Sequence, residues 1–122
     1  MGVFSVRVLL FPMDAPSETR GVDMVVDTGA TYSLVPQNLL RDLRVRPERR
    51  RRFTLANGRT VVRELGWVGV EYGGDRTYSL VIFGEPGDAP LLGAFALEGL
   101  GLEVDPNRGV LRPARLWLLA AS

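Results

Sequence analysis

The sequence predicts an all-β domain whose sheet closes into a barrel-like shape, with one or two short helices. Most of the chain is made of short runs rich in β-branched and apolar residues, separated by Gly and Pro turns. Only residues 36–43 and 94–100 place apolar residues at helical spacing. With 122 residues, of which 46% are hydrophobic and 24% charged, the chain is expected to form one domain over residues 1–122.

The composition excludes several kinds of chemistry. The chain has no Cys and no His, which rules out thiol nucleophiles, Ser-His catalysis and the usual zinc ligand sets. Hydrolytic chemistry would have to be carried out by carboxylates, so we expect neither a cofactor nor a metal. The net charge of +1 gives no reason to expect a nucleic acid or a membrane as partner. The apolar N-terminal run lacks a basic leader region and a cleavage site, and a cytoplasmic protein is expected.

The first quarter of the chain predicts two strands that lead to an acid. Residues 3–11 alternate as a strand does, and residues 12–21 form a loop marked by Pro and Gly. Residues 22–26 form a strand that ends at Asp27, and residues 33–35 form its short continuation. Pro36 suits the first turn of a helix, which is expected to run to Leu43.

Arginines dominate the next segment. Residues 41–52 hold seven Arg against two acids and end in the run Arg49-Arg50-Arg51-Arg52. A surface for nucleic acid or an acidic substrate is one interpretation, but no aromatic residues are interleaved to stack bases. A solvated loop before the next strand is the favoured prediction.

Two hairpins are predicted in the middle of the chain. The first joins residues 53–56 to residues 59–63 across Asn57-Gly58, a pair that supplies both positive φ values of a type I′ turn. It is either a mobile flap over a binding cleft or an ordinary surface hairpin. The second hairpin joins residues 66–72 to residues 76–83 across Gly73-Gly74-Asp75.

The last third of the chain begins with a Gly/Pro loop over residues 84–90, followed by Leu91-Leu92-Gly93. A short helix is expected over residues 94–100, and a final hairpin joins residues 102–105 to 109–111. The tail carries an apolar run, Leu116-Trp117-Leu118-Leu119, that a lone subunit has little reason to expose.

Asp27 is the strongest candidate for a functional group. An ionised acid at the end of an apolar strand is costly unless it is used or paired, and Gly29 allows a sharp turn directly after it. One alternative is a strand that ends in an Asx-type turn, in which the aspartate caps its own backbone. Asp27-Thr28-Gly29-Ala30-Thr31 also fits a phosphate loop of the actin-like sugar kinases, but that fold needs several hundred residues. The Asp-x-Asp phosphatase pattern fails at Gly29.

Asp27-Thr28-Gly29-Ala30, together with the later Leu91-Leu92-Gly93, resembles the single-lobed, retroviral-type (retropepsin-like) aspartic protease family. The resemblance implies the closed retropepsin fold and an aspartic endopeptidase that acts on a peptide or protein substrate. It also implies a homodimer, because each chain supplies one Asp of a dyad that activates water. The roles it implies are Asp27 as catalytic residue, Thr28, Gly29 and Ala30 as active-site loop, Leu91, Leu92 and Gly93 as loop support, and Ala56, Asn57 and Gly58 as flap and substrate-binding residues.

The sequence departs from the viral pattern at two linked positions. Viral members carry an Asp two residues after the Gly of the loop and an Arg after the hydrophobic-hydrophobic-Gly motif, and the two form an ion pair. Here these positions are Thr31 and Ala94, so no buried charge is left without its partner. The alternative function is a catalytically silent domain that binds a peptide or a protein without cleaving it. Residues 1–8 and 111–119 are predicted to form the dimer interface, because they place apolar strand-like sequence at the ends of the chain.

Overall fold

The computed structural model describes residues 3–119. Its elements, in chain order, are β1 (Ser5–Phe11), β2 (Arg20–Val26), β3 (Ser33–Pro36), α1 (Gln37–Asp42), β4 (Arg49–Thr54), β5 (Thr60–Tyr72), β6 (Asp75–Gly84), β7 (Leu91–Leu92), α2 (Ala94–Gly99), β8 (Leu102–Asp105) and β9 (Val110–Pro113). The prediction of a mainly β fold with two short helices is confirmed.

The main sheet closes on itself. Seven strands lie in the order β1-β2-β7-β3-β6-β5-β4, and β1 also pairs with β5. This extra pairing joins β1, β2, β7, β3, β6 and β5 into a ring, whereas β4 stays outside it with β5 as its neighbour. A closed sheet leaves few unpaired edges, and the ring bears out the predicted barrel-like shape.

The interior of the ring is apolar and continuous with the inner faces of both helices. One buried cluster consists of Val8, Leu10, Met24, Val35, Leu40, Leu43, Val45, Val68, Val70, Val81, Phe83, Leu92, Ala96, Leu97 and Leu100. α1 packs against β3 and β6, and α2 packs against β6, β8 and β3. Each helix has an apolar side on this cluster, so their stability comes from packing and not from their length.

The helices occupy the predicted segments but are slightly shorter. α1 begins at Gln37, because Pro36 is still extended (φ −52°, ψ 131°) and ends β3. α2 ends at Gly99, one residue before the predicted end. Both differences lie within the usual variation at helix ends.

The two central hairpins share one strand. The sequence predicts two separate strands over residues 59–63 and 66–72, but β5 runs unbroken over 13 residues and pairs first with β4 and then with β6. The type I′ prediction at Asn57-Gly58 is wrong, because of these two residues only Gly58 has a positive φ (86°). Here Gly58 N–H donates to Leu55 O at 2.9 Å, as in a three-residue hairpin loop. Two consecutive positive φ values, 60° and 83°, occur instead at Gly73-Gly74.

The arginine run is also a correction. Arg49–Arg52 were predicted to lie in a loop, but they form the first four residues of β4, paired in register with residues 62–65 of β5. The backbone hydrogen bonds of the ladder decide the conformation here, and side-chain charge does not oppose it, because all four side chains are exposed.

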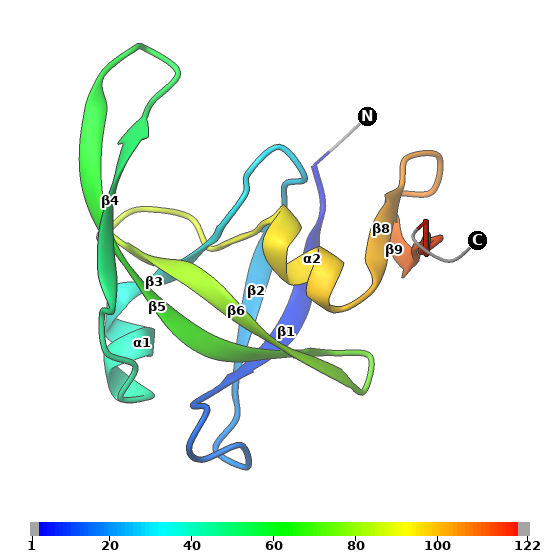
Figure 1. The fold of residues 1–122 in the computed structure, drawn as a ribbon, viewed down its shortest axis with the longest axis horizontal. Helices are drawn as coiled ribbons and strands as arrows, with labels where there is room; N and C mark the ends of the chain where they lie inside the picture. The colour runs from blue at the N-terminus through cyan, green and yellow to red at the C-terminus, as the bar shows by residue number, and fades with distance from the viewer. Residues whose placement is uncertain (1–2, 120–122) are drawn as a thin grey trace.

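Figure 1 shows how these elements are distributed in space. The β4–β5 hairpin projects away from the ring on one side, whereas the small β8–β9 sheet and both ends of the described chain lie on the other. The apolar tail, residues 116–119, packs little: its four side chains are 70–82% exposed. Among the helices formed by residues 3–119, none has the length and apolar character needed to cross a membrane.

Candidate active site

Asp27 follows directly after β2, a strand held from both sides. β2 is antiparallel to β1 and parallel to β7. Val26 N–H donates to Phe4 O and Asp27 N–H donates to Leu92 O, each at 3.0 Å. Because neighbours on both sides fix this backbone, the position of Asp27 is set by the ring, while its side chain is exposed.

The turn after Asp27 orients the carboxylate. Gly29 N–H donates to Asp27 Oδ1 at 2.9 Å, and Ala30 N–H donates to Asp27 O at 3.3 Å. The first bond is the Asx-type contact that the alternative interpretation expected. A Cβ at position 29 would lie 3.2 Å from Oδ1, so glycine gives this carboxylate its room.

Leu91-Leu92-Gly93 lies directly behind this loop. Leu91 and Leu92 pair with Val25 and Val26 of β2, and Leu91 also faces Leu34 of β3. A Cβ on Gly93 would lie 2.8 Å from Ala30 O and equally close to the Tyr32 carbonyl. Only glycine fits at that distance from backbone atoms. The structure thus brings the two predicted sequence motifs together, although their roles in catalysis stay predictions.

Ser33 is a site residue that sequence reasoning missed. Its side chain is buried, and its Oγ accepts a hydrogen bond from Gly93 N–H at 2.9 Å. This bond satisfies an amide that would otherwise be buried without a partner. The available signal was a lone hydroxyl in the otherwise apolar segment Ser33-Leu34-Val35.

The departure at Thr31 and Ala94 has a structural replacement. Ala94 N–H donates to Ala30 O at 2.7 Å, and Phe95 N–H donates to Thr31 O at 2.9 Å. The next side chains, Tyr32 and Phe95, stack with ring centroids 6.3 Å apart and an interplanar angle of 29°. Backbone hydrogen bonds and an aromatic pair therefore join the loop to α2 where viral members use an ion pair.

The aromatic contacts extend to the hairpin. The Tyr32 ring meets Phe53 of β4 edge-on at 6.3 Å, and Trp67 of β5 meets Phe95 at 5.9 Å. These four residues, which we name the aromatic cluster, connect the Asp27 loop, α2, β4 and the part of β5 that lies in the ring. They were not predicted as a group, because the residues are far apart in the sequence.

The predicted flap residues Ala56, Asn57 and Gly58 lie at the exposed tip of the β4–β5 hairpin. Asn57 Oδ1 accepts a hydrogen bond from Arg59 N–H at 2.9 Å, which stabilises the tip itself. In this structure it is Phe53, and not the tip, that contacts the segment following Asp27.

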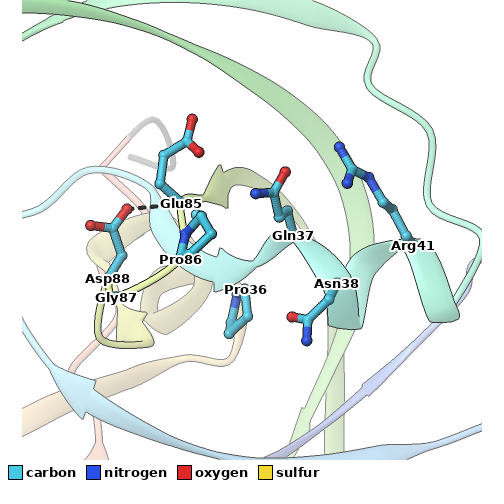
Figure 2. Close-up of a pocket in the computed structure, with 9 residues that line it drawn as sticks. Pro36, Gln37, Asn38, Arg41, Glu85, Pro86, Gly87 and Asp88 are labelled. Carbon is cyan, nitrogen blue, oxygen red and sulfur yellow. Dashed lines mark hydrogen bonds between the residues drawn. The ribbon is translucent and has the colours of Figure 1, made fainter.

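The surface around Asp27 is open. A hollow of about 290 Å³ beside it is lined by Val3, Phe4, Val25, Val26, Asp27, Thr28 and Val104. A second pocket, of about 430 Å³, lies between the start of α1 and the loop after β6, and Figure 2 shows Gln37, Arg41 and Glu85 around it. No residue of the Asp27 loop lines this second pocket. Over residues 3–119, no three His, Cys, Asp or Glu side chains gather as a metal site would require.

A closed sheet that carries one Asp-Thr-Gly loop per chain is the architecture of single-lobed aspartic proteases. Residues 16–98 match the sequence model of the family described as "gag-polyprotein putative aspartyl protease". The match covers more than half of the chain, which therefore belongs to this family.

One solved structure supports the fold, and a second is less similar. The EIAV protease complexed with the inhibitor HBY-793 is 18% identical, with a TM-score of 0.61, and the match covers 96% of this chain and 94% of that one. A retropepsin-like aspartic protease from Rickettsia conorii is 15% identical, with a TM-score of 0.49, over 86% of this chain and 89% of that one. No protein of curated function matches the sequence.

Proposed function

We propose that this protein is a homodimeric aspartic endopeptidase in which each subunit contributes Asp27 to a shared catalytic dyad. The observation that carries the proposal is the exposed Asp27 carboxylate on a loop fixed by β2, β7 and α2, in a chain of the retropepsin-like family. A rigid backbone under an exposed carboxylate is what positioning of a reactive group requires.

One chain supplies half of such a site. Peptide hydrolysis by this chemistry uses two carboxylates about 3 Å apart that share one proton, because two like charges so close cannot both ionise. The acids of the other turns, such as Asp75 and Asp88, accept hydrogen bonds from nearby backbone amides and have no equivalent loop. A second copy of Asp27, related by a two-fold axis, would complete the dyad.

Each residue of the loop then has a defined task. The ionised Asp27 takes a proton from a water held between the two carboxylates, while the protonated copy polarises the scissile carbonyl. Gly29 keeps one carboxylate oxygen oriented through its N–H. Thr28 is exposed beside Asp27, where it would meet the loop of the partner subunit.

The surface near Asp27 supports a partner on that side. Five of the seven residues that line the hollow beside Asp27 are apolar, and Val3 among them is 80% exposed. The exposed residues 116–119 lie on the side of the molecule where both ends of the described chain are found (Figure 1). Burying these side chains in a dimer would remove apolar surface that a monomer leaves in water. Residues 1 and 2 of the predicted interface lie outside the described part.

The test combines cleavage and mass. Sedimentation should show a dimer, and the wild type should cleave members of a peptide library. Asp27→Asn should lower cleavage by about 10³-fold or more, because Asn cannot act as a base. Fold and dimer should be retained, since Asn has the same shape and removes repulsion between two carboxylates. Asp75→Asn, which also removes one acid from a turn, is the matched control and should cleave as the wild type does. A strictly monomeric protein, or wild-type cleavage by Asp27→Asn, would overturn the proposal.

The second candidate is the catalytically silent domain, which the replacement of the viral ion pair at Thr31 and Ala94 favours. It predicts that the wild-type protein binds peptides but does not cleave them. A cytoplasmic place of action is part of the proposal, and it would be tested by cell fractionation.

A further inference from the structure

The outer strand of the hairpin carries an unusual concentration of positive charge. Arg49, Arg50, Arg51 and Arg52 follow one another in β4, and all four are exposed. β4 ends the strand order of the sheet, with β5 as its one neighbour among residues 3–119. Its other side therefore presents backbone N–H and C=O groups that no strand of the described chain uses.

The four charges are not neutralised within the part of the chain that the structure describes. None of them lies within 4 Å of a carboxylate there, whereas the ion pairs of the described chain use Arg7, Arg20, Arg44, Arg63, Arg76 and Arg112.

The pairing register adds to the repulsion along the strand. Arg51 stands directly opposite Arg63 of β5, a like-charge pair that destabilises a sheet. Arg63 itself lies 3.9 Å from Glu85, whereas Arg50 stands opposite Glu64 and forms no ion pair within residues 3–119. Repulsion among these arginines destabilises the hairpin. An anionic partner would bind more tightly because it relieves this repulsion.

We propose that the free edge of β4 binds an extended acidic segment of a partner protein, which pairs with β4 as an additional strand. Side chains alternate between the two faces of a strand, so Arg49 and Arg51 lie on one face and Arg50 and Arg52 on the other. Acidic side chains on either face of the added strand would meet a guanidinium. Arg–carboxylate contacts are among the stronger charge-assisted hydrogen bonds, and the backbone pairing supplies the register.

An acidic peptide fits this surface better than a nucleic acid does. The only aromatic residue of β4 is Phe53, and its ring already packs against Tyr32. No ring on this strand is therefore available to stack bases. A free sheet edge matches the hydrogen-bonding groups of a peptide backbone and not those of a phosphate backbone.

The binding test uses the Asp27→Asn protein, so that no peptide is cleaved during the measurement. The probe is a fluorescein-labelled ten-residue peptide of alternating Glu and Thr, followed by anisotropy at about 150 mM salt. Its matched control has Gln in place of every Glu. The Glu peptide should bind at least about tenfold more tightly than the Gln peptide, because charge-assisted contacts are lost in the latter.

Variants locate the site. Arg50→Gln combined with Arg52→Gln should weaken binding of the Glu peptide at least about tenfold. Arg108→Gln combined with Arg115→Gln removes the same charge from exposed positions between β8 and β9 and just after β9, and should change binding less than about twofold. Figure 1 shows that β8 and β9 lie on the side of the molecule away from β4. A Glu peptide N-methylated at alternate residues keeps its charge but loses backbone donors, and it should bind as weakly as the Gln peptide.

Several outcomes would overturn the inference. Equal binding of the Glu and Gln peptides would leave the arginines as charges that only keep edge strands apart. An equal loss of Glu-peptide affinity in both double variants would show a general charge effect. Full binding of the N-methylated peptide would show that the peptide does not pair with β4 as a strand. Tighter binding of a ten-residue oligothymidylate than of the Glu peptide would assign the strand to nucleic acid. The binding measurement needs no catalysis. A negative binding result therefore does not contradict the proposed protease activity, and a wild type that cleaves no peptide does not contradict this inference.

Discussion

The two halves of β5 belong to different environments, although they form one continuous strand. Residues 65–70 are buried except for Trp67, and they pair with β6 and, from Gly69, also with β1. Residues 60–64 alternate between exposed and half-buried and pair with β4. The first half of the strand therefore belongs to a hairpin that stands away from the ring, and the second half is part of the ring.

The ring and the β4–β5 hairpin therefore differ in how firmly they are held. The ring holds Asp27 through hydrogen bonds on both sides of β2, so that the carboxylate keeps one place. The hairpin has a single ladder and few buried side chains, which are the features of segments that open at low free energy. One strand thus connects the rigid support of Asp27 to a hairpin that we expect to open locally.

The largest contrast is expected between two glycines. Gly93→Ala should lower the free energy of unfolding by about 3 kcal/mol, since the new Cβ would meet backbone atoms of Ala30 and Tyr32. Gly58→Ala, at the hairpin tip, meets no atom within 4 Å and costs only the strain of its φ of 86°, about 1 kcal/mol. Urea unfolding measures both. Equal decreases in the free energy of unfolding would mean that the ring and the hairpin do not differ in their tolerance of an added Cβ.

A matched pair of valines within β5 sharpens the same comparison. Val70→Ala should destabilise the protein by about 2 kcal/mol, because Val70 is 1% exposed and its methyl groups leave a cavity. Val62→Ala should change stability by less than about 0.5 kcal/mol, because Val62 is 48% exposed.

Amide exchange of the wild type gives an independent measurement of that difference. Residues 66–70 should exchange near the free energy of global unfolding, and residues 60–64 should exchange through local opening well below it. Uniform protection along β5 would contradict the division into two halves.

The smallest expected effect concerns the connection between the two regions. Tyr32→Ala removes the aromatic ring that contacts both Phe53 and Phe95. It should lower the free energy of unfolding by about 1 kcal/mol and speed amide exchange in β4. Tyr32→Phe keeps the ring and should behave as the wild type. Tyr78→Ala, an exposed tyrosine that contacts Phe11, is the control and should leave exchange in β4 unchanged. No change in Tyr32→Ala would show that the aromatic cluster does not hold the hairpin.

Local patterns were sufficient for most strands and for selecting the two motifs of the candidate site, whose catalytic roles stay predictions. Alternation along residues 3–11, the apolar run before Asp27 and the Gly/Pro turns each depend on neighbours in sequence, and the elements lie where they predict. Asp27-Thr28-Gly29 and Leu91-Leu92-Gly93 were recognised from the sequence, and the structure brings them into contact through Gly93 and Ala30. The turn at Asn57-Gly58 failed because the dipeptide permits a type I′ turn without requiring one.

The tertiary structure decided what depends on residues far apart in the chain. The pairing of β1 with β5 closes the ring, and no periodicity within either strand specifies it. The arginine run became a strand because the ladder with β5 stabilises an extended backbone that charge alone would leave in a loop. The contacts of Ser33 with Gly93, and of Tyr32 with Phe53 and Phe95, join residues far apart in the sequence and form only in the folded chain. The sequence determines which backbone each segment prefers, whereas burial and pairing across the fold determine which side chains face each other.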